Sequence, residues 1–304
     1  MSETTNRAVG DSLSNYVIEK NKVYYIDRNI LKREVKEADV STFEILGYSY
    51  AKDSKNVYCY GEIFEGEDAK TFRKLDDHYS LDNKNAYYYE KIIEEVDVST
   101  FETLGYRYAK DNKNIYYYGK MFEGADVSTF ETLDNGYAKD SKNIYYYGEI
   151  IEGVDAKTFR KLDYYYSKDN KNVYYIDRII EGVDTESFAI IIPDNASAFY
   201  VSKYPSANDV YAKDKYKVYF YGGSVKGVDL PTFEVFDNRI ARDKFNVYYL
   251  NRKLKNIDIE TFEYIGEGCP GNEPTCIRRG SIFKDKNGKY RTDDKDFFEK
   301  FIVK

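Results

Sequence analysis

A short motif recurs along this chain at a nearly constant spacing. It reads Asp-x-x-Thr/Ser-Phe and ends at Phe43, Phe72, Phe101, Phe130, Phe159, Phe188, Phe233 and Phe262. Successive copies are 29 residues apart, with a single spacing of 45 between Phe188 and Phe233. A unit of this size cannot bury a core alone, so the 304-residue chain is predicted to stack its units as a tandem array.

A second anchor, an Asp followed five residues later by Tyr, moves with the first. Its copies are Asp53, Asp82, Asp111, Asp140, Asp169, Asp214 and Asp243. A polar turn follows each, such as Asp111–Asn114, and then a β-branched and aromatic run such as Ile115–Tyr118. We predict three short strands and one helical turn in each unit. Alternation along the strands predicts one buried face and one wetter face.

The pair after the aromatic run is predicted to be a two-residue hairpin turn. Its first position is Gly, Asp or Asn, with Glu90 as the exception, and we expect this position to supply the positive φ that such turns need. The pairs begin at Gly61, Gly119, Gly148, Asp177, Gly222 and Asn251. The motif Asp is expected to cap the helical turn and the motif Phe to be buried.

The predicted fold class is all-β with short helical turns. Tandem 29-residue β-meander repeats are expected to form an open curved array, with a propeller-like closed ring as the alternative. The predicted divisions are a polar N-terminal segment (1–15), repeats 1–6 (16–188), an insertion (189–210), repeats 7–8 (211–263), and a Pro/Gly/Cys loop with a degenerate C-terminal capping repeat (264–304).

The strings Asp140–Tyr146 and Asp169–Tyr175 resemble the repeat of the bacterial DKNYY family. The likeness covers about residues 16 to 263. The resemblance implies a tandem-repeat protein from a bacterium or a phage, without an assigned activity and without a catalytic residue that can be transferred. Many members look exported, whereas residues 1–15 are polar and offer no apolar stretch of an export signal.

Composition excludes several classes of function. The chain has 35 Tyr but a single His, so a His-rich metal site is ruled out and a His-dependent nucleophilic enzyme would rely on His78 alone. A net charge of −7 disfavours direct nucleic-acid binding. No apolar run is long enough to span a membrane. We expect a cytoplasmic protein that is not an enzyme and uses no cofactor and no metal.

Several motifs have plainer explanations. The Asp-x-Lys-Asn turns place Lys where a calcium loop needs an oxygen ligand. The Gly-x-Gly-x-x-Gly string at 266–271 contains Pro270, which blocks the helix that a dinucleotide site requires. His78 occupies a variable column and is expected to be exposed and generic. Cys59 is expected to be a packing residue, and Cys269 and Cys276 to be either free thiols or a small disulfide loop.

Two groups of residues are candidates for binding a partner. One is an acidic row made by equivalent positions of stacked units: Glu65, Glu94, Glu123, Glu152 and Glu181. The other lies in the insertion and consists of Phe199, Tyr200 and Tyr204. A parallel row of lysines is expected at Lys52, Lys110, Lys139, Lys168 and Lys213. The simpler alternative for these rows is a solvated rim that protects strand edges.

The sequence therefore favours a repeat protein that recognises another protein through an acidic, tyrosine-rich surface. One alternative is an inhibitor of a nucleic-acid-handling enzyme, for example a bacterial immunity effector, whose basic channel the acidic rows would occupy. The partner would then be a basic nucleic-acid-binding protein. Another alternative is carbohydrate or cell-wall binding on tyrosine platforms.

Overall fold

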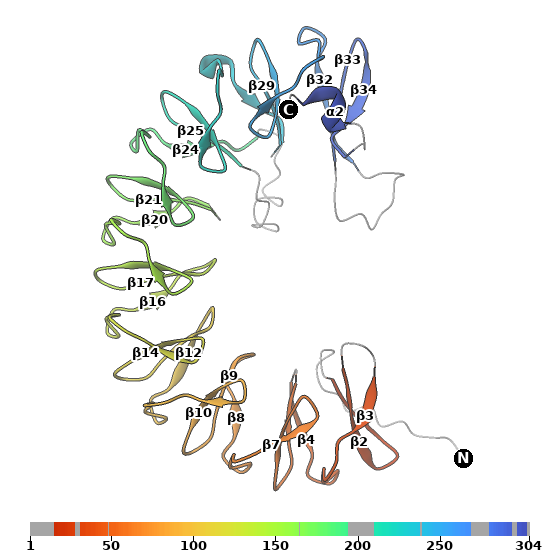
Figure 1. Cartoon of the computed structure of the whole chain (residues 1–304), viewed down its shortest axis with the longest axis vertical. Coiled ribbons are helices and arrows are strands. Elements are labelled where there is room, and N and C mark those ends of the chain that lie inside the picture. The colour runs from red at the N-terminus through yellow and green to blue at the C-terminus, as the bar shows by residue number, and fades with distance from the viewer. Residues whose placement is uncertain are drawn as a thin grey trace. The chain divides into compact units, whose positions relative to one another are not determined.

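The computed structural model describes residues 15–27, 31–47, 49–163, 165–193, 210–237, 239–268, 280–293 and 297–302. Within these residues the chain forms nine small antiparallel sheets in sequence order (Figure 1). Each strand pairs with the next strand along the chain, so every sheet is a simple meander. The predicted all-β class and the tandem β-meander repeat are confirmed.

The first sheet contains β1 (Tyr16–Glu19), β2 (Lys22–Ile26) and β3 (Lys32–Glu34). The next seven sheets have four strands each. The second to fourth contain β4 (Glu44–Gly47), β5 (Tyr50–Lys52), β6 (Val57–Cys59) and β7 (Glu62–Phe64); β8 (Arg73–Lys74), β9 (Tyr79–Leu81), β10 (Ala86–Tyr88) and β11 (Lys91–Ile92); β12 (Glu102–Gly105), β13 (Tyr108–Lys110), β14 (Ile115–Tyr117) and β15 (Lys120–Phe122).

The fifth to eighth sheets contain β16 (Glu131–Thr132), β17 (Tyr137–Lys139), β18 (Ile144–Tyr146) and β19 (Glu149–Ile150); β20 (Arg160–Lys161), β21 (Tyr166–Lys168), β22 (Val173–Tyr175) and β23 (Arg178–Ile179); β24 (Ala189–Ile190), β25 (Tyr211–Lys213), β26 (Val218–Phe220) and β27 (Gly223–Ser224); β28 (Glu234–Val235), β29 (Ile240–Arg242), β30 (Val247–Tyr249) and β31 (Arg252–Lys253). The ninth contains β32 (Glu263–Gly268), β33 (Gly280–Asp285) and β34 (Gly288–Arg291).

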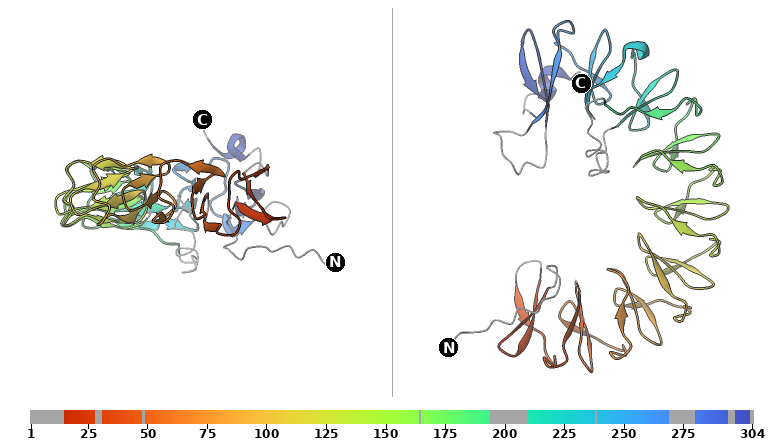
Figure 2. Two further views of the ribbon diagram at one scale, coloured as in Figure 1. Left: turned by 90° about the horizontal axis from the view of Figure 1, so that it is seen from below. Right: turned by 180° about the vertical axis from the view of Figure 1, so that it is seen from behind.

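Contacts divide the chain into two compact units. The first is Met1–Ser141 with Tyr147–Glu149, and the second is Lys142–Tyr146 with Ile150–Lys304. The first four sheets belong to the first unit and the last four to the second. Figure 2 shows from two further directions that the sheets of each unit follow one another in chain order. The choice between an open and a closed array depends on the placement of the two units and stays a prediction.

The second to eighth repeats have four strands rather than the predicted three. The additional strand directly follows the motif Phe: β12 pairs with β13 through Glu102↔Lys110 and Thr103↔Ala109. It is short, and its burial shows no apolar alternation, because its side chains are exposed or half-buried. A strand without this signal looks like a loop in the sequence. The additional strand forms one edge of each four-stranded meander.

Both faces of an internal sheet are buried, which corrects the predicted wet face. In the second sheet, Ala51 and Tyr58 pack with the first sheet, whereas Tyr50 and Val57 pack with Tyr87 of the third. Side chains alternate as predicted, but each set meets a different neighbouring repeat. Six separate small cores join neighbouring sheets in this way among the described residues. Stacking, rather than solvent on one side, stabilises each meander.

The predicted helical turn is mostly a single backbone turn. In the third repeat the Thr100 amide donates to the carbonyl of Asp97 at 3.1 Å and the Asp97 carboxylate accepts from the Ser99 amide at the same distance, without continuing into a helix. One repeat forms a 3-10 helix, η1 (Leu230–Thr232), with Pro231 in its first turn. The motif Phe is buried, as at Phe101, or half-buried, as at Phe43.

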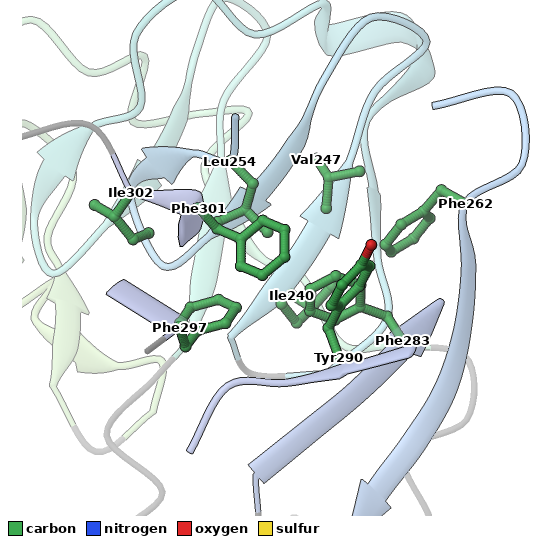
Figure 3. Close-up of a cluster of buried hydrophobic side chains, with 9 residues drawn as sticks. All are labelled: Ile240, Val247, Leu254, Phe262, Phe283, Tyr290, Phe297, Phe301 and Ile302. Carbon is green, nitrogen blue, oxygen red and sulfur yellow. The ribbon is translucent and has the colours of Figure 1, made fainter. Parts of the chain in front are cut away.

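A helix covers the end of the second unit. In α2 (Phe297–Phe301), Phe297 and Phe301 are almost fully buried with Leu254 of the eighth repeat and Phe283 of the ninth sheet. Figure 3 shows these rings and their neighbours. This helix thus covers an apolar face formed by the eighth repeat and the ninth sheet.

The extra residues of the seventh repeat extend its first hairpin. Strand β24 lies in the range predicted as insertion, yet it pairs with β25 through Ala189↔Lys213 and Ile190↔Ala212. The connection between these strands contains the additional residues. Phe199, Tyr200 and Tyr204 lie in it, outside the residues that the structure describes.

Two serines occupy a column that otherwise holds alanine, and this yields a stability prediction. Ser80 and Ser167 are fully buried, and the structure gives their hydroxyls no hydrogen-bond partner. We expect Ser80→Ala to raise the free energy of unfolding by about 1 kcal/mol, because it removes an unsatisfied buried hydroxyl. Chemical denaturation measures this. The reverse change in the fourth repeat, Ala109→Ser, is the matched control and should destabilise; stabilisation by both changes would contradict the argument.

Candidate interaction surface

The anchor Asp organises every repeat from within. In the fourth repeat one Asp111 oxygen accepts from the amides of Lys113 and Asn114, both at 2.7 Å. Its other oxygen accepts from the Asp97 amide at 2.9 Å and from the Tyr116 hydroxyl at 2.8 Å. The second hairpin turn, the linking turn and the core tyrosine are thus held by one buried carboxylate. These Asp residues are structural and are not available for catalysis or metal binding.

The anchors make stability depend on pH. Burial raises the pKa of each anchor carboxyl, but the hydrogen bonds that it accepts outweigh burial and hold the pKa below its ordinary value in Asp53, Asp82, Asp111, Asp169, Asp214, Asp243 and Asp285. A lowered folded-state pKa stabilises fully above the unfolded value of about 3.9, and the stabilisation is lost as pH falls through the folded pKa.

We therefore expect level stability from neutral pH down to about pH 5 and a steep cooperative loss below about pH 4. Urea unfolding followed by circular dichroism across this range measures it. A free energy of unfolding that stays level well below pH 3 would show that the anchors carry no such linkage.

A second tyrosine column joins one repeat to the next. The Tyr79 hydroxyl donates to the carbonyl of Arg107 at 2.7 Å and accepts from the Gly119 amide at 3.2 Å, both in the following repeat. The same acceptor bond joins Tyr16 to Gly61 and Tyr166 to Gly222. This hydroxyl therefore forms hydrogen bonds with backbone groups that would otherwise lack a partner at the edge of the sheet.

The hairpin glycine allows this joint to close. A Cβ on Gly119 would lie 2.3 Å from the Cβ of Tyr88 in the preceding repeat. The preceding Tyr118 also has a positive φ of 52°. In the repeats with Asp177 and Asn251 the left-handed residues are Ile176 and Leu250, so the prediction that Asp or Asn supplies the positive φ is wrong there.

The joint between the second and third repeats departs from this pattern. Glu90 replaces the glycine, and Cys59 occupies the column that holds Tyr88 in the next repeat. Cys59 is buried, which raises its pKa to about 12. The Tyr50 hydroxyl, equivalent to that of Tyr79, has no hydrogen-bond partner in the structure. Cys59 is therefore an inert packing residue, as predicted, in a joint that lacks one link.

Exposed tyrosines lie at the hairpin tips. Tyr60, Tyr89 and Tyr118 occupy the left-handed turn position in the first unit and are each about two-fifths exposed. Tyr118 lies 5.9 Å from the ring of Tyr88 in the preceding repeat, and Tyr60 lies 6.4 Å from Tyr25. Each ring thus rests on a half-buried or buried tyrosine and keeps one side open to a partner.

All five residues of the predicted acidic row are exposed: Glu65, Glu94, Glu123, Glu152 and Glu181. None of the five takes part in an ion pair within the part of the chain that the structure describes. Other glutamates differ, since Glu102 pairs with Lys110 at 3.3 Å and Glu131 with Lys139 at 2.8 Å. The row is therefore negative charge that the chain itself leaves unbalanced.

The predicted lysine row is largely occupied by such pairs. Lys52 lies 3.8 Å from Glu44 and donates to the carbonyl of Phe72 at 3.1 Å. Lys168 is buried and donates to the carbonyl of Thr185 at 2.6 Å; burial and the nearby Arg160 lower its pKa. Lys213 is exposed. These lysines belong to the structure of the first hairpin rather than to a free cationic surface.

His78 is half-buried rather than exposed as predicted. Its ring stacks on Tyr88 at 6.1 Å and meets Tyr89 edge-on at 5.6 Å. The equivalent Tyr165 stacks on Tyr175 at 5.8 Å. A flat side chain in this column therefore covers a tyrosine, whereas other repeats hold Ser49 or Gly136 there. Its variability in the sequence hid this packing role.

Among the described residues, no group of three or more His, Cys, Asp or Glu side chains is arranged to hold a metal ion. No helix in the described part of the chain has the length and apolar character needed to cross a membrane. Phe199, Tyr200 and Tyr204, the other candidate contacts, lie outside the described residues and stay a prediction.

Sequence reasoning missed one exposed column. The fourth strand of the second to sixth repeats carries an apolar side chain that is at least one-third exposed: Ile63, Ile92, Met121, Ile150 and Ile179. The sequence analysis made no prediction for this column. A useful signal was available, because the same column holds Ser224 and Lys253 in later repeats, and a core position tolerates neither.

Comparison with known proteins supports the repeat assignment. The model of the DKNYY family matches residues 16–140 and again residues 137–294. The comparisons with curated proteins and with solved structures give no match.

Proposed function

Since the chain belongs to the DKNYY family and is built from its repeats, we propose that it is a non-enzymatic protein that binds another protein through its acidic, tyrosine-bearing surface. Tandem arrays present equivalent side chains in rows, and such rows suit recognition of an extended partner. Tyrosine supports this role because it offers apolar area and a hydroxyl at low cost in conformational entropy.

One observation carries the proposal. The glutamates of the acidic row are exposed and unpaired in consecutive repeats, whereas glutamates of the first hairpin pair with lysines of the neighbouring strand. Unbalanced charge of one sign attracts a partner of the opposite sign and raises its rate of association. The partner is therefore expected to present a basic surface.

The same charge supports a second candidate, inhibition of a nucleic-acid-handling enzyme. Five carboxylates at one per repeat could occupy a basic channel in place of phosphates. This candidate requires a partner that binds nucleic acid and a complex that nucleic acid displaces. Carbohydrate binding on the hairpin-tip tyrosines has no further observation in its favour.

Capture from a lysate of the source organism tests the proposal. The immobilised full chain should retain a protein, and a variant with Lys at all five positions of the acidic row should lose it. Affinity should fall by about tenfold or more between low and high salt. The proposal would be overturned if the wild-type chain retained no protein and also bound no sugar on a glycan array.

The insertion needs its own variant. The triple change Phe199→Ala, Tyr200→Ala and Tyr204→Ala should abolish capture if the insertion contacts the partner. Full capture by this variant would remove the insertion from the binding surface and leave the acidic row as the contact. Displacement of the captured protein by single-stranded or duplex DNA identifies the inhibitor candidate.

A further inference from the structure

The exposed aliphatic column lies beside the acidic row. In the first unit it consists of Ile63, Ile92 and Met121, with exposed fractions of 36%, 55% and 40%. Each precedes by two residues a row glutamate, which lies in the turn that follows the strand. The strands that carry them, β7, β11 and β15, are the outer strands of their sheets.

The hairpin tip adds a third exposed side chain to each repeat. We define the tip strip as one exposed tyrosine, one aliphatic residue and one glutamate from each of three repeats: Tyr60, Ile63, Glu65; Tyr89, Ile92, Glu94; Tyr118, Met121, Glu123. All nine residues lie in the first unit. The strip combines apolar area with unpaired negative charge.

The fold does not require these residues. In the seventh repeat the aliphatic and acidic columns hold Ser224 and Lys226, and in the eighth they hold Lys253 and Lys255. Both repeats form the same four-stranded meander with the same register. Packing therefore leaves both columns unconstrained, and the aliphatic and acidic pair in the second to fourth repeats needs an explanation outside the repeat fold.

We propose that the tip strip binds a basic amphipathic helix, whose apolar stripe covers the aliphatic residues and tyrosines while flanking Lys or Arg side chains meet the glutamates. This inference rests on the proposed function and names its partner chemistry. The outer strands are two or three residues long, which is too short for strand addition by a partner. A helix presents apolar and basic side chains side by side on one face, as the two columns require.

A synthetic helix tests the proposal on the full chain. The probe is the fluorescein-labelled peptide LKKLLKLLKKLLKL, and fluorescence anisotropy measures its affinity. One triple variant takes the residue of the seventh repeat (Ile63→Ser, Ile92→Ser, Met121→Ser), and another takes the lysine of the seventh and eighth (Glu65→Lys, Glu94→Lys, Glu123→Lys). We expect each to weaken binding by about tenfold or more. Because the same residues already occupy these columns elsewhere in the chain, both variants should fold.

Two controls distinguish specific binding at the tip strip from non-specific binding. Phe245→Ser removes an even more exposed apolar side chain in another column and should leave the affinity within about twofold of wild type. A peptide with Ser in place of every Leu keeps the charge and should bind at least about tenfold more weakly. Equal binding of the Ser peptide, or unchanged binding by both triple variants, would overturn the inference.

Failure of the tip strip can be distinguished from failure of the proposed function. If the Ile/Met→Ser variant still captures the wild-type protein partner from lysate, the tip strip is wrong while protein binding stands. If the wild-type chain captures no protein, the proposed function fails whatever the peptide does.

Discussion

Replacement of Asp111 by alanine is expected to lower the free energy of unfolding by about 3–5 kcal/mol. The change removes an acceptor from three backbone amides and from the Tyr116 hydroxyl, at a position where the Asp111 carboxylate is almost completely buried. Hydrogen bonds to a charged group contribute about 1.5–3 kcal/mol each, and donors left buried without a partner add a desolvation penalty. Few single substitutions destabilise a protein this strongly.

Asp97→Ala is the matched control for this experiment. Asp97 lies in the motif that closes the preceding repeat, and its carboxylate accepts from the amide and hydroxyl of Ser99 at the protein surface. We expect a loss of about 1 kcal/mol, as for an ordinary cap. Urea denaturation gives both values, and hydrogen exchange should show the Asp111→Ala loss concentrated in the fourth repeat and its two neighbours. Equal losses for the two variants would contradict the anchor role.

Replacement of Gly119 by alanine is expected to cost about 3–4 kcal/mol. Two effects add: a left-handed φ of 71°, which costs an L-residue about 1–2 kcal/mol, and an overlap of the new methyl with the Cβ of Tyr88 at 2.3 Å. The contacted atom is the root of a side chain, so a change of rotamer does not relieve the overlap. The third hairpin of the fourth repeat must instead shift, which breaks the link from Tyr79.

Gly124→Ala isolates the first effect. Gly124 has a φ of 85° in the same repeat, and nothing lies within 4 Å of the position that its Cβ would take. It should therefore lose only the backbone cost. Thermal and chemical unfolding of the two variants measure the difference. A Gly119→Ala variant as stable as Gly124→Ala would show that the joint between repeats adjusts without loss of free energy of unfolding.

The parts of the fold that could be predicted are those copied in every repeat. Asp111 and Tyr116, five residues apart, and the small Ala109 recur in fixed columns, and the structure brings all three together in one buried arrangement. Their side chains alone indicate what they do, because a recurring carboxylate in a polar turn and a recurring ring in a strand have few structural alternatives.

Other features depend on what the neighbouring repeat contributes. Strand β12 was not predicted because its side chains, exposed or half-buried, show no apolar alternation that would reveal its pairing with β13. The second buried face was missed because one repeat, read alone, does not show that Tyr50 meets Tyr87 of the next. The exposure of the aliphatic column was not predicted either, since Ile92 is apolar and recurs periodically but lies exposed on an outer strand. The exposure of the acidic row was accessible from sequence, whereas its lack of ion pairs was not.

The repeated joint also bears on how the length of such a chain can change. Because Tyr79 meets Gly119 as Tyr166 meets Gly222, a gene deletion or duplication of one whole period recreates a compatible junction, and no core has to be redesigned. The junction that includes Cys59 and Glu90 is the exception, since its two halves match each other and not the rest. We therefore expect recombination between identical periods to leave the second and third repeats next to each other, in the same order.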